Sequence, residues 1–75
     1  MIKKILIANR GEIACRIIST CKELGITAVS IYTKGEEFLP HVLNSDETYC
    51  LGSGELAETY LNIDKIILIG KQSHV

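Results

Sequence analysis

The residues best placed to do chemistry follow the first apolar run of the chain. Asn9, Arg10, Gly11 and Glu12 come directly after this run, and a helical pattern starts at Glu12. A strand, a tight turn and a helix form the unit that binds nucleotides in many α/β proteins, because the helix N-terminus attracts phosphate. We therefore expect these four residues to form a rim loop at the carboxyl end of the first strand.

This rim loop lacks a complete nucleotide-binding motif. A dinucleotide site needs the pattern G-x-G-x-x-G/A, and Gly11 is the only glycine of the loop. Glu12 places a carboxylate where a phosphate would lie. The second predicted strand ends in Tyr32-Thr33-Lys34, which offers no acidic group to a ribose, and Gly52-Ser53-Gly54 lacks the Lys-Ser/Thr of a P-loop. We expect no nucleotide site that is complete within these 75 residues.

A structural role accounts for the same four residues. Asn9 would cap the helix, Arg10 would pair with a carboxylate outside these 75 residues, and Gly11 would permit the tight turn. Glu12 would oppose the positive end of the helix dipole. The functional and the structural interpretation of the rim loop both stay open at this point.

The cysteines and histidines form no metal or disulfide pattern. The chain has three cysteines, an odd number, with no C-x-x-C spacing: Cys15, Cys21 and Cys50. The two histidines, His41 and His74, are far apart in the sequence. A zinc site needs four suitable ligands close together. We therefore expect free thiols, no metal site and a reducing, intracellular environment.

Charge and hydropathy exclude two classes of partner. Eight basic and nine acidic side chains give a net charge of −1, whereas nucleic-acid and acidic-membrane binders depend on clustered positive charge. No apolar run approaches the length of a membrane-spanning helix, and Asn9 ends the first run too early for a signal peptide. We expect a globular chain with no nucleic-acid partner and no membrane partner.

Hydrophobic periodicity predicts the elements that position the rim loop. Lys4–Ala8 is typical of a strand buried on both faces, and Thr27–Tyr32 of a second strand. Between them, Glu12 to Leu24 predicts an amphipathic helix that ends at Gly25. Its apolar side chains, within one arc of about 140°, are Ile13, Ala14, Ile17, Ile18, Cys21 and Leu24. A strand–helix–strand unit of this size predicts parallel strands.

The second half of the chain predicts the rest of a small parallel sheet. Pro40 begins a short helix that runs to about Asn44, and Thr48–Leu51 is a third strand. A last helix begins near Asn62, which is a good N-cap, with Asp64 in the first turn. The expected inner face of this helix consists of Ile63, Ile66, Ile67 and Gly70.

The last helix is apolar beyond its expected inner face. Leu68 and Ile69 lie partly outside that face, so a further layer or a partner should cover them. The expected fold class is α/β, with a Rossmann-like parallel sheet in the order 3-2-1 that is truncated before a fourth strand. Its first strand would then be an open edge, and such edges invite pairing with other chains.

Several segments resemble one known family. The run Ile7–Ala14 (I-A-N-R-G-E-I-A) with Arg16-Ile17 resembles the opening of the biotin carboxylase domain of biotin-dependent carboxylases. The resemblance continues, in order, through Cys21–Ile26, His41-Val42, Asp46-Glu47 and Tyr60–Ile67. It implies that residues 1–75 are a partial N-terminal biotin carboxylation subdomain, the Rossmann-like segment that precedes the ATP-grasp core.

The resemblance also implies an activity. Enzymes of this family use ATP and bicarbonate, with Mg or Mn, to carboxylate biotin on a carrier domain or protein. Their nucleotide-clamping, metal-binding and bicarbonate-binding residues come later in the chain and have no counterpart here. The resemblance thus implies no catalytic, cofactor-binding or metal-binding residue within this inactive segment. It does not name the acceptor, because acetyl-CoA, propionyl-CoA, methylcrotonyl-CoA, pyruvate and urea carboxylases share this opening.

One stripe of the first predicted helix carries polar residues. Glu12, Arg16, Ser19 and Glu23 share it, opposite the apolar arc. The resemblance implies that Arg16, Ser19 and Glu23 lie at a subunit interface of a homo-oligomer, although Ser19 stands where relatives often carry arginine. The alternative is a solvent-exposed face with a Glu12–Arg16 pair.

Two other interpretations stay open. The chain could be a free-standing α/β module that binds a nucleotide or a protein, or an inert remnant of a larger protein. The absence of a visible targeting segment favours the cytoplasm, and the mitochondrial matrix is the alternative.

Overall fold

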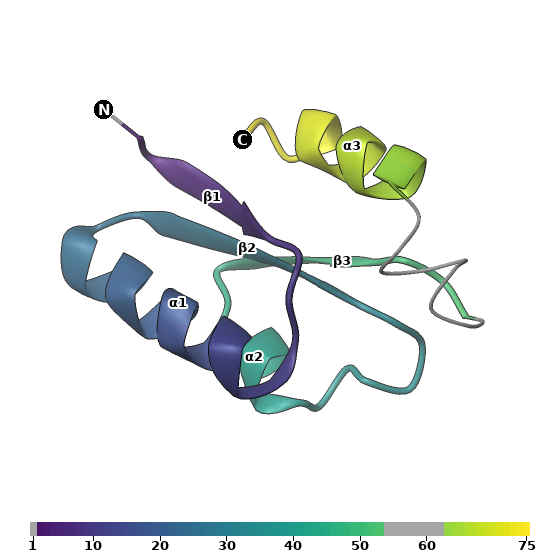
Figure 1. Ribbon diagram of the computed structural model, residues 1–75, viewed down its shortest axis with the longest axis horizontal. Coiled ribbons are helices and arrows are strands. Elements are labelled where there is room, and N and C mark those ends of the chain that lie inside the picture. The colour runs from purple at the N-terminus through teal and green to yellow at the C-terminus, as the bar shows by residue number, and fades with distance from the viewer. Residues whose placement is uncertain (1, 54–62) are drawn as a thin grey trace.

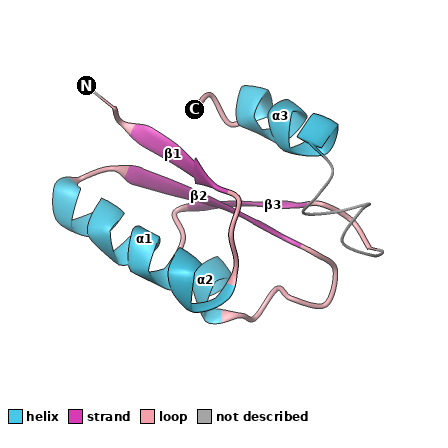
Figure 2. Ribbon diagram, in the orientation of Figure 1, coloured by secondary structure: helices cyan, strands magenta, loops and turns pink. Residues whose placement is uncertain are grey.

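Three parallel strands carry helices on both faces (Figures 1 and 2). The computed structural model describes residues 2–53 and 63–75. Their elements are β1 (Lys4–Ile7), α1 (Gly11–Leu24), β2 (Thr27–Tyr32), α2 (Pro40–Leu43), β3 (Glu47–Cys50) and α3 (Ile63–Gln72). Each of these elements is predicted from the sequence, and β1, α1, α2 and β3 differ from prediction by a single residue at their ends. The predicted cap Asn62 and the predicted turn residue Gly54 lie outside the described residues.

The sheet has the order β1-β2-β3, with every neighbouring pair parallel. In the register of the first pair, Lys4 lies opposite Thr27 and Ile7 opposite Ser30. Residues 28–31 of the central strand β2 are all buried, as expected for a strand that is covered on both faces. The predicted Rossmann-like α/β class is therefore confirmed. Within the described part of the chain, the outer edge of β1 has no strand beside it.

Two apolar clusters hold the helices on the sheet, one on each face. The cluster under α1 contains Ile7, Ala14, Ile18, Cys21 and Ala28. The cluster under α3 contains Ile31, Leu51 and Ile69. Full burial of one isoleucine side chain contributes about 1.5–3 kcal/mol, so these contacts outweigh any single surface interaction. No helix in the described ranges is long and apolar enough to cross a bilayer.

Two members of the predicted apolar arc of α1 do not enter the core. Ile13 and Leu24 are exposed, whereas Ala14, Ile18 and Cys21 are buried. The exposed pair occupies one margin of the arc. Because β1 is the last strand on one side of the described sheet, that margin has no sheet beneath it to cover it.

The inner face of α3 differs from the prediction. Ile69 is buried and Ile67 is exposed, so the prediction was wrong for these two residues. Ile66, Ile69 and Ser73 recur at spacings of three and four and form the covered stripe. The Lys4 ammonium helps to select this stripe, because its Nζ donates to the Ser73 carbonyl at 2.8 Å while it pairs with Glu47 Oε2, also at 2.8 Å.

The predicted C-terminal cap of α1 is confirmed. Gly25 has φ +71°, and the N–H of Ile26 donates to the Cys21 carbonyl at 2.8 Å. This closure uses a left-handed residue, a conformation that glycine adopts without steric cost. It turns the chain sharply from α1 into β2.

Alanine substitutions at two glycines should change stability in opposite directions. Gly25→Ala should lower the free energy of unfolding by about 1 kcal/mol, because the left-handed conformation is costly for alanine even though the space around it is open. Gly70→Ala should raise it by up to about 1 kcal/mol, because alanine favours a helix interior and its Cβ would lie at ordinary distances of 3.6 Å from Val75 and 3.7 Å from Leu6. Urea denaturation measures both. Equal shifts of the same sign would contradict the conformational explanation.

Candidate functional site

The rim loop lies at the carboxyl end of β1, as predicted. Asn9, Arg10, Gly11 and Glu12 are all exposed, and Gly11 has φ +74°. Arg10 occupies the N-cap position of α1, and α1 has no side-chain cap hydrogen bond. The prediction that Asn9 caps the helix was therefore wrong, because α1 begins at Gly11, one residue earlier than the apolar pattern indicates.

Arg10 pairs with a carboxylate of this chain. Its Nη1 lies 3.1 Å from Glu36 Oε2, in the loop between β2 and α2. The other oxygen of Glu36 accepts hydrogen bonds from the backbone N–H of Thr33, at 3.0 Å, and from the Thr33 hydroxyl. The expectation that the partner of Arg10 lies outside these 75 residues is therefore wrong. One carboxylate thus joins the loops that follow the two strands.

Backbone contacts extend this connection to the third strand. The N–H of Lys34 donates to the Gly52 carbonyl at 2.9 Å, and Lys65 Nζ of α3 donates to the Leu51 carbonyl at 3.0 Å. The three loops at the carboxyl edge are therefore tied to one another. The role of Glu36 was not predicted from the sequence. The available signal was the spacing T-x-x-E in Thr33–Glu36, which is typical of a residue whose carboxylate returns to the backbone three positions earlier.

The charges of the rim loop do not suit a phosphate. Glu36 offsets the charge of Arg10, and the Glu12 carboxylate lies in the first turn of α1, where a phosphate would bind. Glu12 pairs weakly with Arg16 at 3.8 Å, and both side chains are more than 80% exposed, at 84% and 81%. The arrangement favours a rigid scaffold that holds strand ends together.

The polar stripe of α1 lies on the surface. Arg16, Ser19 and Glu23 are exposed, and the Glu12–Arg16 pair predicted for a solvated face is present. Ser19 also lines a shallow cavity of about 250 Å³ with Cys15, Lys22 and Asn44. The role of the stripe in a subunit interface stays a prediction.

The histidines and cysteines are dispersed through the described part of the chain. His41 is fully buried, and neither of its ring nitrogens has a hydrogen-bond partner there. Cys21 is buried, Cys15 is half-buried and Cys50 is exposed. Among residues 2–53 and 63–75, no three His, Cys, Asp or Glu side chains are grouped so that they could hold a metal ion.

Glu37 should titrate below the ordinary range of a glutamate. The backbone N–H of Gly35 lies 3.0 and 3.1 Å from its two carboxylate oxygens, and this hydrogen bonding lowers the pKa of Glu37 from its ordinary 4.5. Because the folded state favours the ionised form, the contribution of Glu37 to stability is present above pH 4.5 and is lost as the pH falls through the lowered pKa. Carboxyl ¹³C titration by NMR measures the midpoint. An unshifted midpoint would contradict these hydrogen bonds, and Glu37→Gln, which removes the titrating carboxyl group, provides the control that assigns its resonance.

Comparison with known proteins places this scaffold in a family. The profile of the family described as "Biotin carboxylase, N-terminal domain" matches residues 1–75. "Biotin carboxylase" of Haemophilus influenzae is 52% identical over 67 residues, which cover 89% of this chain and 15% of that protein. "Biotin carboxylase 1" of Bacillus subtilis is 48% identical over 71 residues, which cover 95% of this chain and 16% of that protein.

The fold agrees with the sequence. The solved structure of the "Biotin Carboxylase domain of Thermophilic 2-Oxoglutarate Carboxylase bound to Bicarbonate" superposes with a TM-score of 0.93 at 48% identity, over 100% of this chain and 17% of that one. The chain thus spans about a sixth of the length of the relatives that it matches. Since the match extends from the first residue to the last and joins sequence to fold, this chain belongs to the biotin carboxylase N-terminal domain family.

Proposed function

We propose that residues 1–75 are the N-terminal scaffold of an ATP-dependent biotin carboxylase, a ligase that carboxylates biotin with bicarbonate. The observation that carries the proposal is the likeness in sequence and fold along the whole chain. The partner would be a biotin carboxyl carrier domain or protein. The compartment stays a prediction, with the cytoplasm first and the mitochondrial matrix as the alternative.

The described residues do not fit ATP or a divalent metal. Glu36 already engages Arg10 of the rim loop, Glu12 places negative charge at the start of α1, and the described part shows no cluster of metal ligands. We therefore assign no catalytic, nucleotide-binding or metal-binding residue to this chain. ATP, Mg or Mn, and biotin would bind to other parts of the longer protein.

A scaffold role is consistent with the contacts at the carboxyl edge. Ligands of open α/β sheets bind beside this edge, so its loops must hold a constant shape. Arg10, Glu36 and Thr33 join the first two loops, and Lys34 joins the second loop to Gly52. In this proposal the chain supplies a rigid sheet edge beside the ligand site, and the reacting groups belong to other parts of the longer protein.

This chain and a longer polypeptide should differ in nucleotide binding and in activity. The 75-residue chain should show no saturable binding of ATP or NAD(P) in calorimetric titrations at millimolar nucleotide. A polypeptide that begins with these residues and has the length of the relatives should release ADP only when bicarbonate and biotin are both present.

Each arm of this experiment can fail independently. Binding of ATP to the 75-residue chain more tightly than about 0.1 mM, or roughly −5.5 kcal/mol, would overturn the assignment of the nucleotide site to other residues. ATP hydrolysis by the longer polypeptide that does not depend on biotin would overturn the proposed reaction.

The polar stripe of α1 should contribute to a homo-oligomer of the longer protein. We propose that Arg16 and Glu23 reach across a two-fold axis, where each residue is used twice. Removal of one partner from a desolvated charge pair costs about 3–5 kcal/mol, so Arg16→Glu should weaken the dimer by more than about a hundredfold. Glu23→Arg in the same chain should restore it. Sedimentation equilibrium measures both variants, and a dimer constant that neither variant changes would mean that the stripe is solvated surface.

A further inference from the structure

Two ion pairs of the described residues join distant parts of the chain, one at each end of the sheet. At the carboxyl ends of the strands, Arg10 Nη1 lies 3.1 Å from Glu36 Oε2. At the amino ends, Lys4 Nζ lies 2.8 Å from Glu47 Oε2. Each of the four side chains is less than half exposed. Ligands of open α/β sheets bind beside the carboxyl ends, so the two ion pairs are alike in structure and differ in their distance from such a ligand.

Glu36 is held in place by its own loop. Its Oε1 accepts hydrogen bonds from the Thr33 N–H, at 3.0 Å, and from the Thr33 hydroxyl, and the Glu36 N–H donates to the Thr33 carbonyl at 2.9 Å. Lys34 of the same turn donates its N–H to the Gly52 carbonyl at 2.9 Å. The carboxylate therefore projects from a turn that is anchored to the residues after β3, and it presents Oε2 to Arg10 from a fixed point.

Arg10 lies in the middle of the rim loop. It occupies the N-cap position of α1 in extended backbone, between Asn9 and Gly11, which are both exposed. Gly11 has φ +74°, in a region of backbone conformation that is open to glycine. The rim loop and the turn that carries Glu36 leave the same edge of the sheet (Figure 1). The contact with Glu36 therefore fixes the path by which the chain leaves β1 and enters α1.

We propose that Glu36 is a positioning residue for the reaction of the longer protein. Through Arg10, it holds the rim loop in the shape that a ligand bound beside the carboxyl edge requires. The inference rests on the proposed function, and it gives one residue of the scaffold a kinetic role. Protein groups engage both carboxylate oxygens, Thr33 at one and Arg10 at the other, so Glu36 acts through the loop and not on a ligand.

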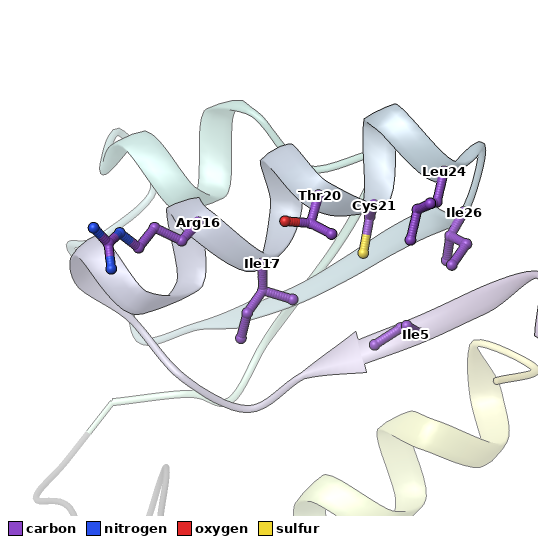
Figure 3. A pocket seen from close by; sticks show the side chains of 7 residues that line it. All are labelled: Ile5, Arg16, Ile17, Thr20, Cys21, Leu24 and Ile26. Carbon is purple, nitrogen blue, oxygen red and sulfur yellow. The ribbon is translucent and has the colours of Figure 1, made fainter.

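The contact between Arg10 and Glu36 lies apart from the apolar groove of the described fold. This groove lies between α1 and β1, has a volume of about 270 Å³, and is lined by the residues labelled in Figure 3. Neither Arg10 nor Glu36 belongs to its lining. A substitution at Glu36 therefore leaves the walls of that groove in place and acts on the rim loop.

Glu36→Gln isolates the contact, because it keeps the size of the side chain and removes one acceptor. A carboxylate offers two acceptor oxygens, whereas a primary amide offers one oxygen and an NH₂ group that only donates. Glutamine can therefore accept from Thr33 or from Arg10, but not from both at their present positions. Glu47→Gln is the matched control at the amino ends, where it removes the same charge from the partner of Lys4.

The experiment measures the reaction of a polypeptide that begins with these residues and has the length of the relatives. Glu36→Gln should lower kcat/KM for biotin carboxylation by about tenfold or more, since a misplacement of about 1 Å can cost about a hundredfold. It should also raise the amount of ADP released per biotin carboxylated, because reactive species hydrolyse in a poorly ordered site. Loss of folded protein lowers both products together and does not change this ratio. Glu47→Gln should leave both quantities unchanged.

Arg10→Met tests the route through Arg10. Because Arg10→Met and Glu36→Gln break the same contact, the double variant should be no less active than the more impaired single variant. Effects that multiply would overturn the proposal. Urea denaturation confirms that each variant is folded. If Glu36→Gln does not fold, Thr33→Val, which removes only the hydroxyl donor to Oε1, should change kcat/KM and the ADP ratio in the same directions.

The outcomes separate this inference from the proposed function. A folded Glu36→Gln variant with an unchanged ADP ratio, or with a kcat/KM no lower than that of Glu47→Gln, would overturn the positioning role and leave the proposed function standing. An unsubstituted polypeptide that carboxylates no biotin would overturn both.

Discussion

A parallel sheet must be covered on both faces, and the rest of this structure depends on that constraint. Residues 28–31 of β2 are buried without interruption, so the side chains on both faces of the sheet must be covered. α1 supplies the partner on one face and α3 on the other. A three-stranded parallel sheet cannot be built from hairpins, since each crossover must carry the chain from one end of the sheet back to the other.

The same connectivity separates the two ends of the sheet. The carboxyl ends of the strands open into the loops that Arg10, Glu36 and Gly52 hold together. At the amino ends, Lys4 joins Glu47 at the start of β3 to Ser73, the residue that follows α3. Each end is therefore fixed by a polar side chain that reaches across elements. A fixed shape of the carboxyl edge is what a ligand bound beside it would require.

Some apolar side chains of the described fold are covered and others are exposed. Cys21 and Ile18 lie under cover, while Leu24 and Ile13 on the adjoining margin of the same helix do not. Ile67 of α3 is likewise exposed on the other side of the sheet. The relatives are about six times as long as this chain. Exposed apolar side chains that lie together in this way are typical of surfaces that contact other protein.

The sequence alone determined which segments form strands and helices, because local hydrophobic periodicity carries that information. The arc of α1, the cap at Gly25 and the buried run of β2 all follow from residue spacing. The family motif lies in the same local segments, so it too is visible without a structure.

Tertiary structure alone decided which margin of each helix is covered: Ile69 packs inward and Ile67 outward, and Leu24 borders an open edge. It also decided the partners of Arg10, Lys4 and Asp46. The Asp46 carboxylate accepts a hydrogen bond from the Ala28 N–H at 2.8 Å. These contacts join residues far apart in the chain, and their formation depends on the distances that the folded sheet sets, which periodicity does not encode.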